Sequence, residues 1–134
     1  MGASPLLVTY GTLMQAAGGF ERLGVADQVS VVGACRFEGR LHDFGRFPGA
    51  VPGAGTVYGE LVRLSDAQAW TGLDRYEGYD PDNEAASLFV RRRVSLTAPA
   101  DQTAWVYWYN DDPGDAPRVP SGDWHASIRG GGPS

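Results

Sequence analysis

Apolar residues recur along most of this chain with the short period of β-strands. Runs of β-branched and aromatic residues favour strands when glycine, proline or polar residues bound them. By this criterion the sequence predicts strands over residues 6–10, 29–37, 56–64, 88–96 and 104–109, the last two joined as a hairpin. Residues 39–44 either continue the second strand or form a short partner for it. The glycine- and proline-rich residues 45–55 are predicted to form an ordered loop.

One segment follows the helical period instead. Trp70, Leu73 and Glu77 have the i, i+3, i+7 spacing of one helix face. Trp70 and Leu73 are expected to face the core, so the last inward position of this helix carries a carboxylate.

Local signals predict the ends of this helix. Ser65 is a good N-cap, and Gln68 three residues later completes a capping box. Gly78 suits the position after the last turn, so the helix is expected to stop at about Glu77. A weaker helix is predicted over residues 15–23.

Strands dominate this pattern, and the connections are too short for repeated βαβ crossovers. We therefore expect residues 1–134 to form a single α+β domain, in which a small, curled, mixed or antiparallel sheet packs on one principal helix. Residues 1–5 and 130–134 are expected to be mobile. Residues 122–124 are candidates to fold back onto the sheet.

Composition narrows the classes of function. The chain has 134 residues, 43% of them hydrophobic and 20% charged, which is typical of a globular protein. The net charge of -5 argues against nucleic acid or an anionic membrane as the main partner. All basic residues are arginines, which excludes a Schiff-base lysine, and the one cysteine excludes an intrachain disulfide. No apolar run reaches the length of a membrane span, so a soluble, cytoplasmic protein is expected.

Most motifs for catalysis or metal binding are absent from the sequence. His42 and His125 are far apart and lack a metal-ligand spacing, so no metal site is expected. Cys35 lies in an apolar strand and is interpreted as a small buried hydrophobe. Residues 91–93 are three arginines in a predicted strand, of which two are expected to be solvated and one to pair with an acid.

Two features remain as candidate chemistry. A carboxylate at the apolar face, if buried, has its pKa raised, which is the environment of a general base. Glu77 therefore either serves as a base or swings into water after the last helical turn. Residues 10–13 follow a buried strand, and their backbone N–H groups either form a nest for an anion or belong to an ordinary turn.

Several short motifs, taken in order, resemble the γ-glutamylcyclotransferase-like family, also called AIG2-like. They are Tyr10-Gly-Thr-Leu13, Phe47-Pro48, Val57-Tyr-Gly-Glu-Leu61, Leu73-Asp-Arg-Tyr-Glu-Gly-Tyr79, Arg91-x-x-Val94, Ala104-Trp-Val-Tyr107 and Ser121-Gly-Asp-Trp124. The resemblance runs from about Leu6 to Trp124. The sequence departs from the family pattern at Phe89, near which the family usually has a tyrosine.

The resemblance implies a fold, a reaction and a site. The fold is a small mixed barrel with helices outside. The reaction is that of a γ-glutamylamine cyclotransferase, which releases 5-oxoproline and a free amine from a γ-glutamyl amine or γ-glutamyl amino acid, without metal or cofactor. Tyr10, Gly11, Thr12 and Leu13 would bind the α-amino acid end of this small-molecule substrate, and Glu77 would be the catalytic acid and base.

Two alternatives share this fold. One is a biosynthetic tailoring enzyme that removes a γ-glutamyl protecting group from a larger amine. The other is a non-catalytic binding module, in which Glu77 only recognises an ammonium group. The pocket for the leaving amine is expected to come from loops such as residues 45–55 and 80–86.

Overall fold

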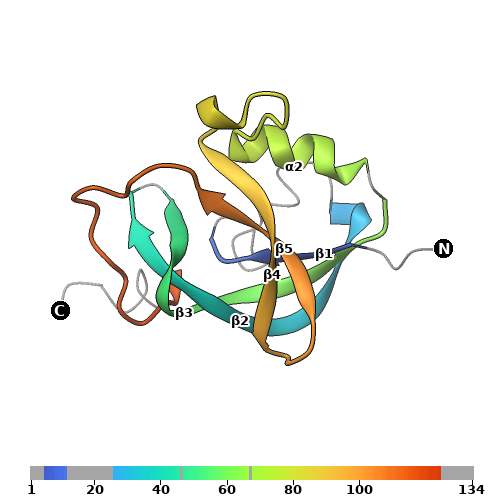
Figure 1. Cartoon of the computed structure of the whole chain (residues 1–134). Coiled ribbons are helices and arrows are strands. Elements are labelled where there is room, and N and C mark those ends of the chain that lie inside the picture. The colour runs from blue at the N-terminus through green and yellow to red at the C-terminus, as the bar shows by residue number, and fades with distance from the viewer. Residues whose placement is uncertain (1–4, 12–25, 46, 67, 125–134) are drawn as a thin grey trace.

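Five strands of this protein close into a barrel, as the computed structural model in Figure 1 shows. The structure describes residues 5–11, 26–45, 47–66 and 68–124. In chain order the elements are β1 (Leu6–Thr9), η2 (Ala26–Gln28), β2 (Val29–Asp43), β3 (Pro48–Leu64), α2 (Ala69–Glu77), η3 (Glu84–Ala86), β4 (Phe89–Ala98) and β5 (Thr103–Tyr109).

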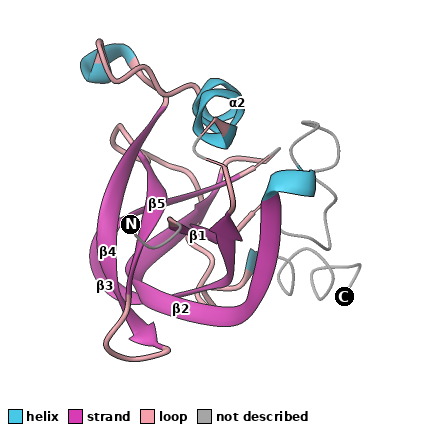
Figure 2. Ribbon diagram, turned by 90° about the vertical axis from the view of Figure 1, so that its right-hand side faces the viewer, coloured by secondary structure: helices cyan, strands magenta, loops and turns pink. Residues whose placement is uncertain are grey.

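The barrel is a mixed sheet with the strand order β1-β3-β2-β4-β5. Neighbouring strands are antiparallel except β1 and β5, which run parallel where Leu7 pairs with Trp105. Among the described residues α2 is the single α-helix, and it lies outside the barrel (Figure 2). The predicted α+β fold, a mixed barrel-like sheet packed on one principal helix, is confirmed.

Two apolar clusters form the core. Inward-facing residues such as Val57 and Leu61 of β3 fill the barrel. Outward-facing residues such as Val62 and Leu64 of the same strand pack beneath α2, against the fully buried Leu73. The end of β3 is therefore buried on both faces, and burial on both faces fixes α2 to the barrel wall.

The prediction of a loop over residues 45–55 is wrong, because β3 already begins at Pro48. It pairs with a β2 that runs unbroken to Asp43, and Leu41 lies opposite Ala50. Residues 52–55 form a bulge between the pairs Glu38–Thr56 and Arg40–Val51. Proline is tolerated at the first residue of a strand and at a bulge, since neither position must donate to the ladder.

The predicted capping box is also wrong, because α2 begins at Ala69. The N–H group of Ser65 donates to the Gln28 carbonyl at 2.9 Å and so extends the sheet. The backbone N–H of Gln68 donates to the Asp66 carboxylate at 2.8 Å, and no side chain caps the helix from Gln68. Tertiary pairing of the chain after β3 outcompetes the local capping signal.

The predicted helix end is correct. Gly78 follows Glu77 in the left-handed conformation, with φ 68°. Its N–H donates to the Arg75 carbonyl at 3.2 Å, and the N–H of Tyr79 donates to the Asp74 carbonyl at 2.8 Å. These two bonds make a Schellman motif, which glycine accommodates without steric penalty.

Other segments agree with the sequence. The first strand lies at Leu6–Thr9, and β4 and β5 form the expected hairpin. Gly122 does fold back, because its carbonyl accepts from the Tyr58 N–H at 2.8 Å and Trp124 is buried in the barrel cluster. The predicted helix over residues 15–23 and the two predicted mobile ends, apart from Pro5, lie outside the described residues. No helix within the described ranges is long and apolar enough to span a membrane.

Candidate active site

A cavity of about 280 Å³ opens where five segments of the fold meet. They are the end of β1, the start of β3, the last turn of α2, the residues entering β4, and β5 at Tyr107. The described lining residues are Val8, Thr9, Tyr10, Gly11, Phe47, Pro48, Tyr76, Glu77, Leu88, Phe89 and Tyr107.

Three of the sequence-predicted site residues line this one cavity. Tyr10 and Gly11 approach it from the end of β1, and Glu77 approaches it from the end of α2. Thr12 and Leu13 lie outside the described residues. The fold thus brings together the two features that the sequence singled out, although they are far apart along the chain.

Glu77 occupies an electrostatically unusual position. It is the last residue of α2, one turn after the fully buried Leu73, and it keeps only partial exposure. Burial, and to a smaller extent the nearby carboxylate of Asp74, together raise the pKa of its carboxyl from 4.5 to about 8. A carboxyl with this pKa can both accept and return a proton near neutral pH.

Tyr10 has a structural hydrogen-bonding role. Its hydroxyl donates to the Tyr107 carbonyl at 2.6 Å and accepts from the Ala50 N–H at 3.1 Å. Burial is the main cause that raises the pKa of this phenol, and the negative charge of Glu77 adds to it. The hydroxyl therefore stays neutral and fixes the start of the 10–13 segment, which leaves the backbone and ring of Tyr10 for the cavity.

Gly11 is required by packing against Pro48. A Cβ at this position would lie 2.6 Å from Cγ and 2.8 Å from Cδ of the proline ring. The glycine lets the end of β1 approach the first residue of β3 closely. Its presence is therefore explained before any ligand is considered.

A polar network behind the cavity was missed by the sequence reasoning. The Tyr107 hydroxyl donates to Asp74 Oδ1 at 2.6 Å, and Arg91 Nη2 donates to Asp74 Oδ2 at 3.3 Å. The Arg91 guanidinium lies 4.0 Å from the centroid of the Trp70 ring, in cation–π geometry. Burial raises the pKa of Asp74, while Tyr107 and Arg91 oppose that shift. The available signal was Asp74 itself, one turn before Glu77 on the same helix.

A model of the family described as gamma-glutamyl cyclotransferase, AIG2-like, matches residues 7–126. The chain belongs to this family. The gamma-glutamylcyclotransferase family protein YtfP of Escherichia coli K12 is 29% identical over 85 residues, which are 63% of this chain and 66% of that protein. The match therefore spans slightly less than two thirds of the relative's length.

Solved structures share the same fold. The protein PH0828 of Pyrococcus horikoshii superposes with a TM-score of 0.69 at 21% identity, over 94% of this chain and 93% of the other. YkqA of Bacillus subtilis gives 0.70 at 23% identity, over 97% of this chain and 44% of YkqA. The solution structure of E. coli ytfP gives 0.63 at 25% identity, over 89% and 95%.

This member of the AIG2-like family has an aromatic wall at Phe89, the position where the sequence departs from the family pattern. The Phe89 ring packs edge-on to Phe47 at 5.8 Å between ring centroids and to Tyr109 at 5.7 Å. Phe89 contributes no hydrogen-bonding group to the cavity.

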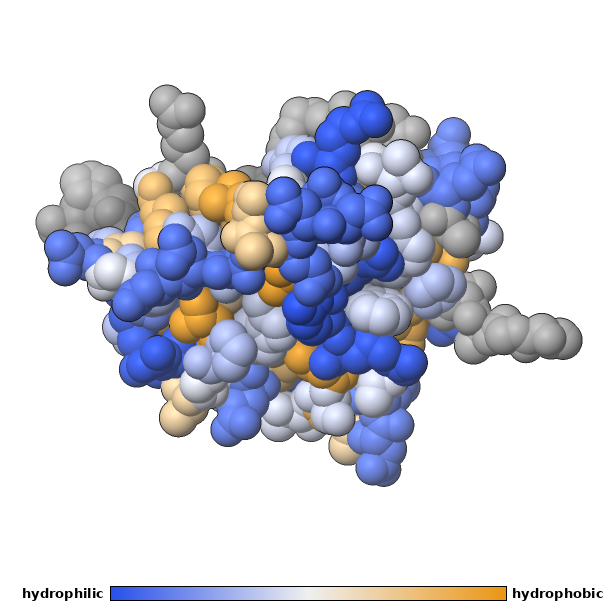
Figure 3. All heavy atoms as spheres, turned by 45° about the horizontal axis from the view of Figure 1, so that its top comes forward, coloured by the Kyte–Doolittle hydropathy of each residue, from blue (hydrophilic) through white to orange (hydrophobic). Residues whose placement is uncertain are grey.

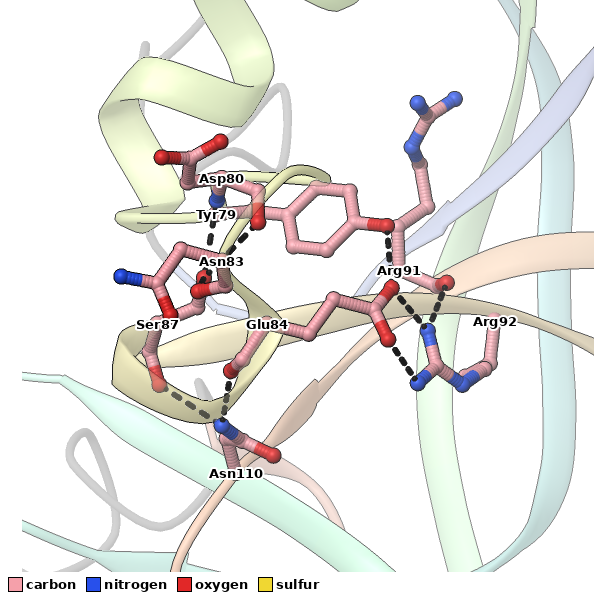
Figure 4. A network of polar contacts seen from close by, with 8 residues as sticks. All are labelled: Tyr79, Asp80, Asn83, Glu84, Ser87, Arg91, Arg92 and Asn110. Carbon is pink, nitrogen blue, oxygen red and sulfur yellow. Dashed lines mark hydrogen bonds and ion pairs between the residues drawn. The ribbon is translucent and has the colours of Figure 1, made fainter.

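The loop over residues 80–86 does not line the cavity, contrary to expectation. Figure 4 shows how side chains hold it in place. Tyr79 donates from its hydroxyl to the Glu84 carboxylate at 2.7 Å, and Asn110 Nδ2 donates to the carbonyls of Glu84 at 2.7 Å and Ser87 at 2.9 Å. From the 45–55 segment, Phe47 and Pro48 do line the cavity.

The prediction for the arginine run is correct in that two of the three, Arg92 and Arg93, are exposed, but it is wrong about the number of ion pairs. Arg92 pairs with Glu84 through two contacts of 3.0 and 2.9 Å, in addition to the pair between Arg91 and Asp74. Arg93 donates to Thr103 Oγ1 at 2.8 Å. Two of the three arginines therefore pair with acids, because acidic residues of α2 and η3 lie over β4.

Cys35 is buried in the barrel, and burial raises the pKa of its thiol to about 12. A thiol with this pKa is not a nucleophile at neutral pH, which agrees with its interpretation as a small hydrophobe. Over the described ranges, no group of three or more His, Cys, Asp and Glu side chains could hold a metal ion.

Proposed function

We propose that this protein is a cyclotransferase that releases 5-oxoproline and a free amine from a γ-glutamyl amine or γ-glutamyl amino acid. The observation that supports this most strongly is the shared cavity. It combines a carboxyl with a pKa of about 8 at Glu77 with the chain segment of Tyr10 and Gly11. An α-amine also has a pKa of about 8, so a proton can pass between the two groups at little cost.

The reaction would need one proton carrier. The Glu77 carboxylate takes a proton from the substrate's α-ammonium, and the freed nitrogen attacks the γ-carbonyl carbon of the same molecule. A five-membered ring closes, the carbonyl oxygen becomes an oxyanion and the ring nitrogen still carries two protons. Glu77 gives its first proton to the leaving nitrogen and takes the second proton from the ring nitrogen. Collapse of the oxyanion then breaks the bond between the γ-carbon and the leaving nitrogen, and the proton left on Glu77 passes to the released amine or to water. The products are 5-oxoproline and the free amine.

Binding the substrate in a folded conformation, with its α-amine close to its γ-carbonyl, would account for much of the rate acceleration. The nucleophile and the electrophile share one molecule, so correct orientation replaces a nucleophile from the protein. Backbone N–H groups of the 10–13 segment would hold either the α-carboxylate or the developing oxyanion. In this scheme the protein needs no cofactor.

The test is turnover by Glu77→Gln. The amide is nearly isosteric with the carboxyl but cannot accept the proton, so the rate of 5-oxoproline release should fall by about 100-fold or more. Mass spectrometry of 5-oxoproline measures turnover, and calorimetry with the same γ-glutamyl compound should show retained binding.

Glu38→Gln is the matched control, because Glu38 is an exposed strand residue that does not line the cavity. It should leave turnover unchanged. Unchanged 5-oxoproline release by a folded Glu77→Gln protein would contradict the mechanism. A wild-type protein that binds γ-glutamyl compounds and releases no 5-oxoproline would be a binding module.

A further inference from the structure

Two large apolar side chains are exposed at the mouth of the candidate active site. Tyr76 is 41% exposed and Leu88 is 46% exposed, and both line the cavity. Figure 3 shows that hydrophilic residues cover most of the molecular face in that view, with apolar residues gathered in a few smaller patches. Single exposed apolar residues need no explanation, but a pair at the mouth of a cavity marks a surface suited to contact with a ligand.

The fold fixes the backbone at both of these positions. The N–H of Leu88 donates to the Gly78 carbonyl at 3.0 Å, and the Leu88 carbonyl accepts from the Asn110 N–H at 3.0 Å. The Asn110 side chain also holds the carbonyls of Glu84 and Ser87, as Figure 4 shows. Tyr76 lies in the last turn of α2, directly before Glu77. The backbone of the rim is therefore preorganised, which reduces the entropic cost of binding.

The walls below this rim are also apolar. Phe47 and Phe89 face the cavity, and their rings pack against each other. None of the described lining residues is Arg, Lys or His, and Glu77 is the one acid among them. Arg91, two residues after Phe89 on β4, is paired with Asp74 and stacked on Trp70.

The described lining residues therefore offer no partner for a charged leaving group. A carboxylate there would meet no described cation and would be repelled by Glu77 when that residue is ionised. A second ammonium group at the rim would meet tyrosine and leucine, because Glu77, the one acid among the described lining residues, is engaged by the substrate's α-ammonium in the proposed reaction. Burying an unpaired charge is costly, whereas an alkyl or aryl group would cover the exposed apolar surface.

We propose that the amine released by this enzyme is uncharged apart from its reacting nitrogen, and that its alkyl or aryl body lies on Tyr76 and Leu88. This inference rests on the proposed cyclotransferase function. Within that function it selects γ-glutamyl derivatives of apolar amines over γ-glutamyl amino acids and γ-glutamyl diamines.

The experiment compares four substrates with the wild-type chain. They are the γ-glutamyl amides of methylamine, isobutylamine, glycine and 1,4-diaminobutane. The methylamide is the reference, because methylamine is the smallest leaving group of the four. We expect kcat/KM for the isobutylamide to exceed the values for the glycine and diaminobutane compounds by about 10-fold or more.

Two variants locate the preference. Leu88→Ala should lower kcat/KM for the isobutylamide by about 5-fold, mainly through KM, and leave the methylamide within about 2-fold. The matched control is Val32→Ala, because Val32 is 48% exposed but lies on β2 and does not line the cavity. Val32→Ala should leave kcat/KM unchanged for both the isobutylamide and the methylamide.

The outcomes separate this inference from the function on which it rests. Turnover of the methylamide with an equal or greater preference for the charged leaving groups overturns the inference and leaves the cyclotransferase intact. The inference is also overturned if Leu88→Ala leaves kcat/KM for the isobutylamide unchanged, or if it lowers kcat/KM for all four substrates equally. Absence of 5-oxoproline from every compound overturns the proposed function and this inference with it.

Discussion

Two features of its surroundings raise the pKa of Glu77. Apolar burial at the end of α2 disfavours its ionised form, and the Asp74 carboxylate one turn earlier repels it. Asp74 is itself held by the Tyr107 hydroxyl and by Arg91. In the proposed reaction Asp74 would therefore act through the pKa of Glu77.

The change Asp74→Asn tests this coupling. It removes a negative charge near Glu77, so the pKa of Glu77 should fall and the rising limb of the kcat/KM profile should move to lower pH. The Asn oxygen can still accept from Tyr107, which keeps the ring in place. The measurement is kcat/KM for the γ-glutamyl methylamide against pH, with Asp82→Asn in the exposed loop as control. An unmoved rising limb would refute the coupling.

At the scale of single residues, the sequence predicts the position of Glu77 but does not predict the contacts of the neighbouring Asp74. The i, i+3, i+7 spacing and Gly78 together predicted a carboxylate at an inward helix end, and its raised pKa follows from burial there. The contact between Asp74 and Arg91 joins a helix to a strand. Nothing in a local pattern specifies which acid meets which of three consecutive arginines.

The end of α2 is the element that fixes the candidate site. Gly78 adopts the left-handed conformation, its N–H and that of Tyr79 close the helix, and its carbonyl accepts from the N–H of Leu88. One residue thus fixes both the helix end that carries Glu77 and the start of the rim. Strain introduced here should affect stability and substrate affinity together.

The change Gly78→Ala should show both effects. An alanine in the left-handed region costs about 1–2 kcal/mol, and the new Cβ would lie 3.2 Å from Cβ of Leu88. The matched control is Gly114→Ala, which has φ 58° and open space around the new Cβ. Urea unfolding should give a larger loss for Gly78→Ala, with a raised KM for the isobutylamide. Equal losses and unchanged KM would refute the proposed link.

Two errors at the level of elements have one cause. The local signals at Ser65 and Gln68 predict a capping box, and those of residues 45–55 predict a loop. In the structure the N–H of Ser65 bonds to Gln28, and residues 48–51 pair with the end of β2. Sheet pairing between distant residues determines the structure of both segments. Glycine and proline are compatible with this pairing because they lie at the start of a strand and at a bulge.

On the scale of the whole molecule, closure of the barrel creates the site. The parallel contact of β1 with β5 places the end of β1 beside Tyr107, and the antiparallel pairing of β1 with β3 sets its register. Strand periodicity predicted a curled sheet, whereas the barrel was implied by the resemblance of ordered motifs. Periodicity cannot specify closure, because the pairs that close the barrel are far apart in sequence.

The titration of Glu77 should also affect how the free energy of unfolding of the whole chain depends on pH. In the folded protein the pKa of Glu77 is raised from 4.5 to about 8, so between these values the folded state holds a proton that the unfolded state releases. The free energy of unfolding must then fall as pH rises through this interval, and the loss is complete above the folded pKa. Below about pH 4.5 the carboxyl is protonated in both states and contributes no pH dependence.

The change Glu77→Gln removes this titration, which isolates it from the other acids of the chain. Its free energy of unfolding relative to wild type should therefore increase as pH rises from about 5 to 8. The expected gain is on the order of 2 kcal/mol, since a partly exposed group realises only part of its possible shift. Urea unfolding at a series of pH values measures the difference, with Glu38→Gln as control. Parallel curves for wild type and Glu77→Gln would mean that Glu77 ionises freely in the folded protein, and a base of ordinary pKa would be poorly matched to an α-amine.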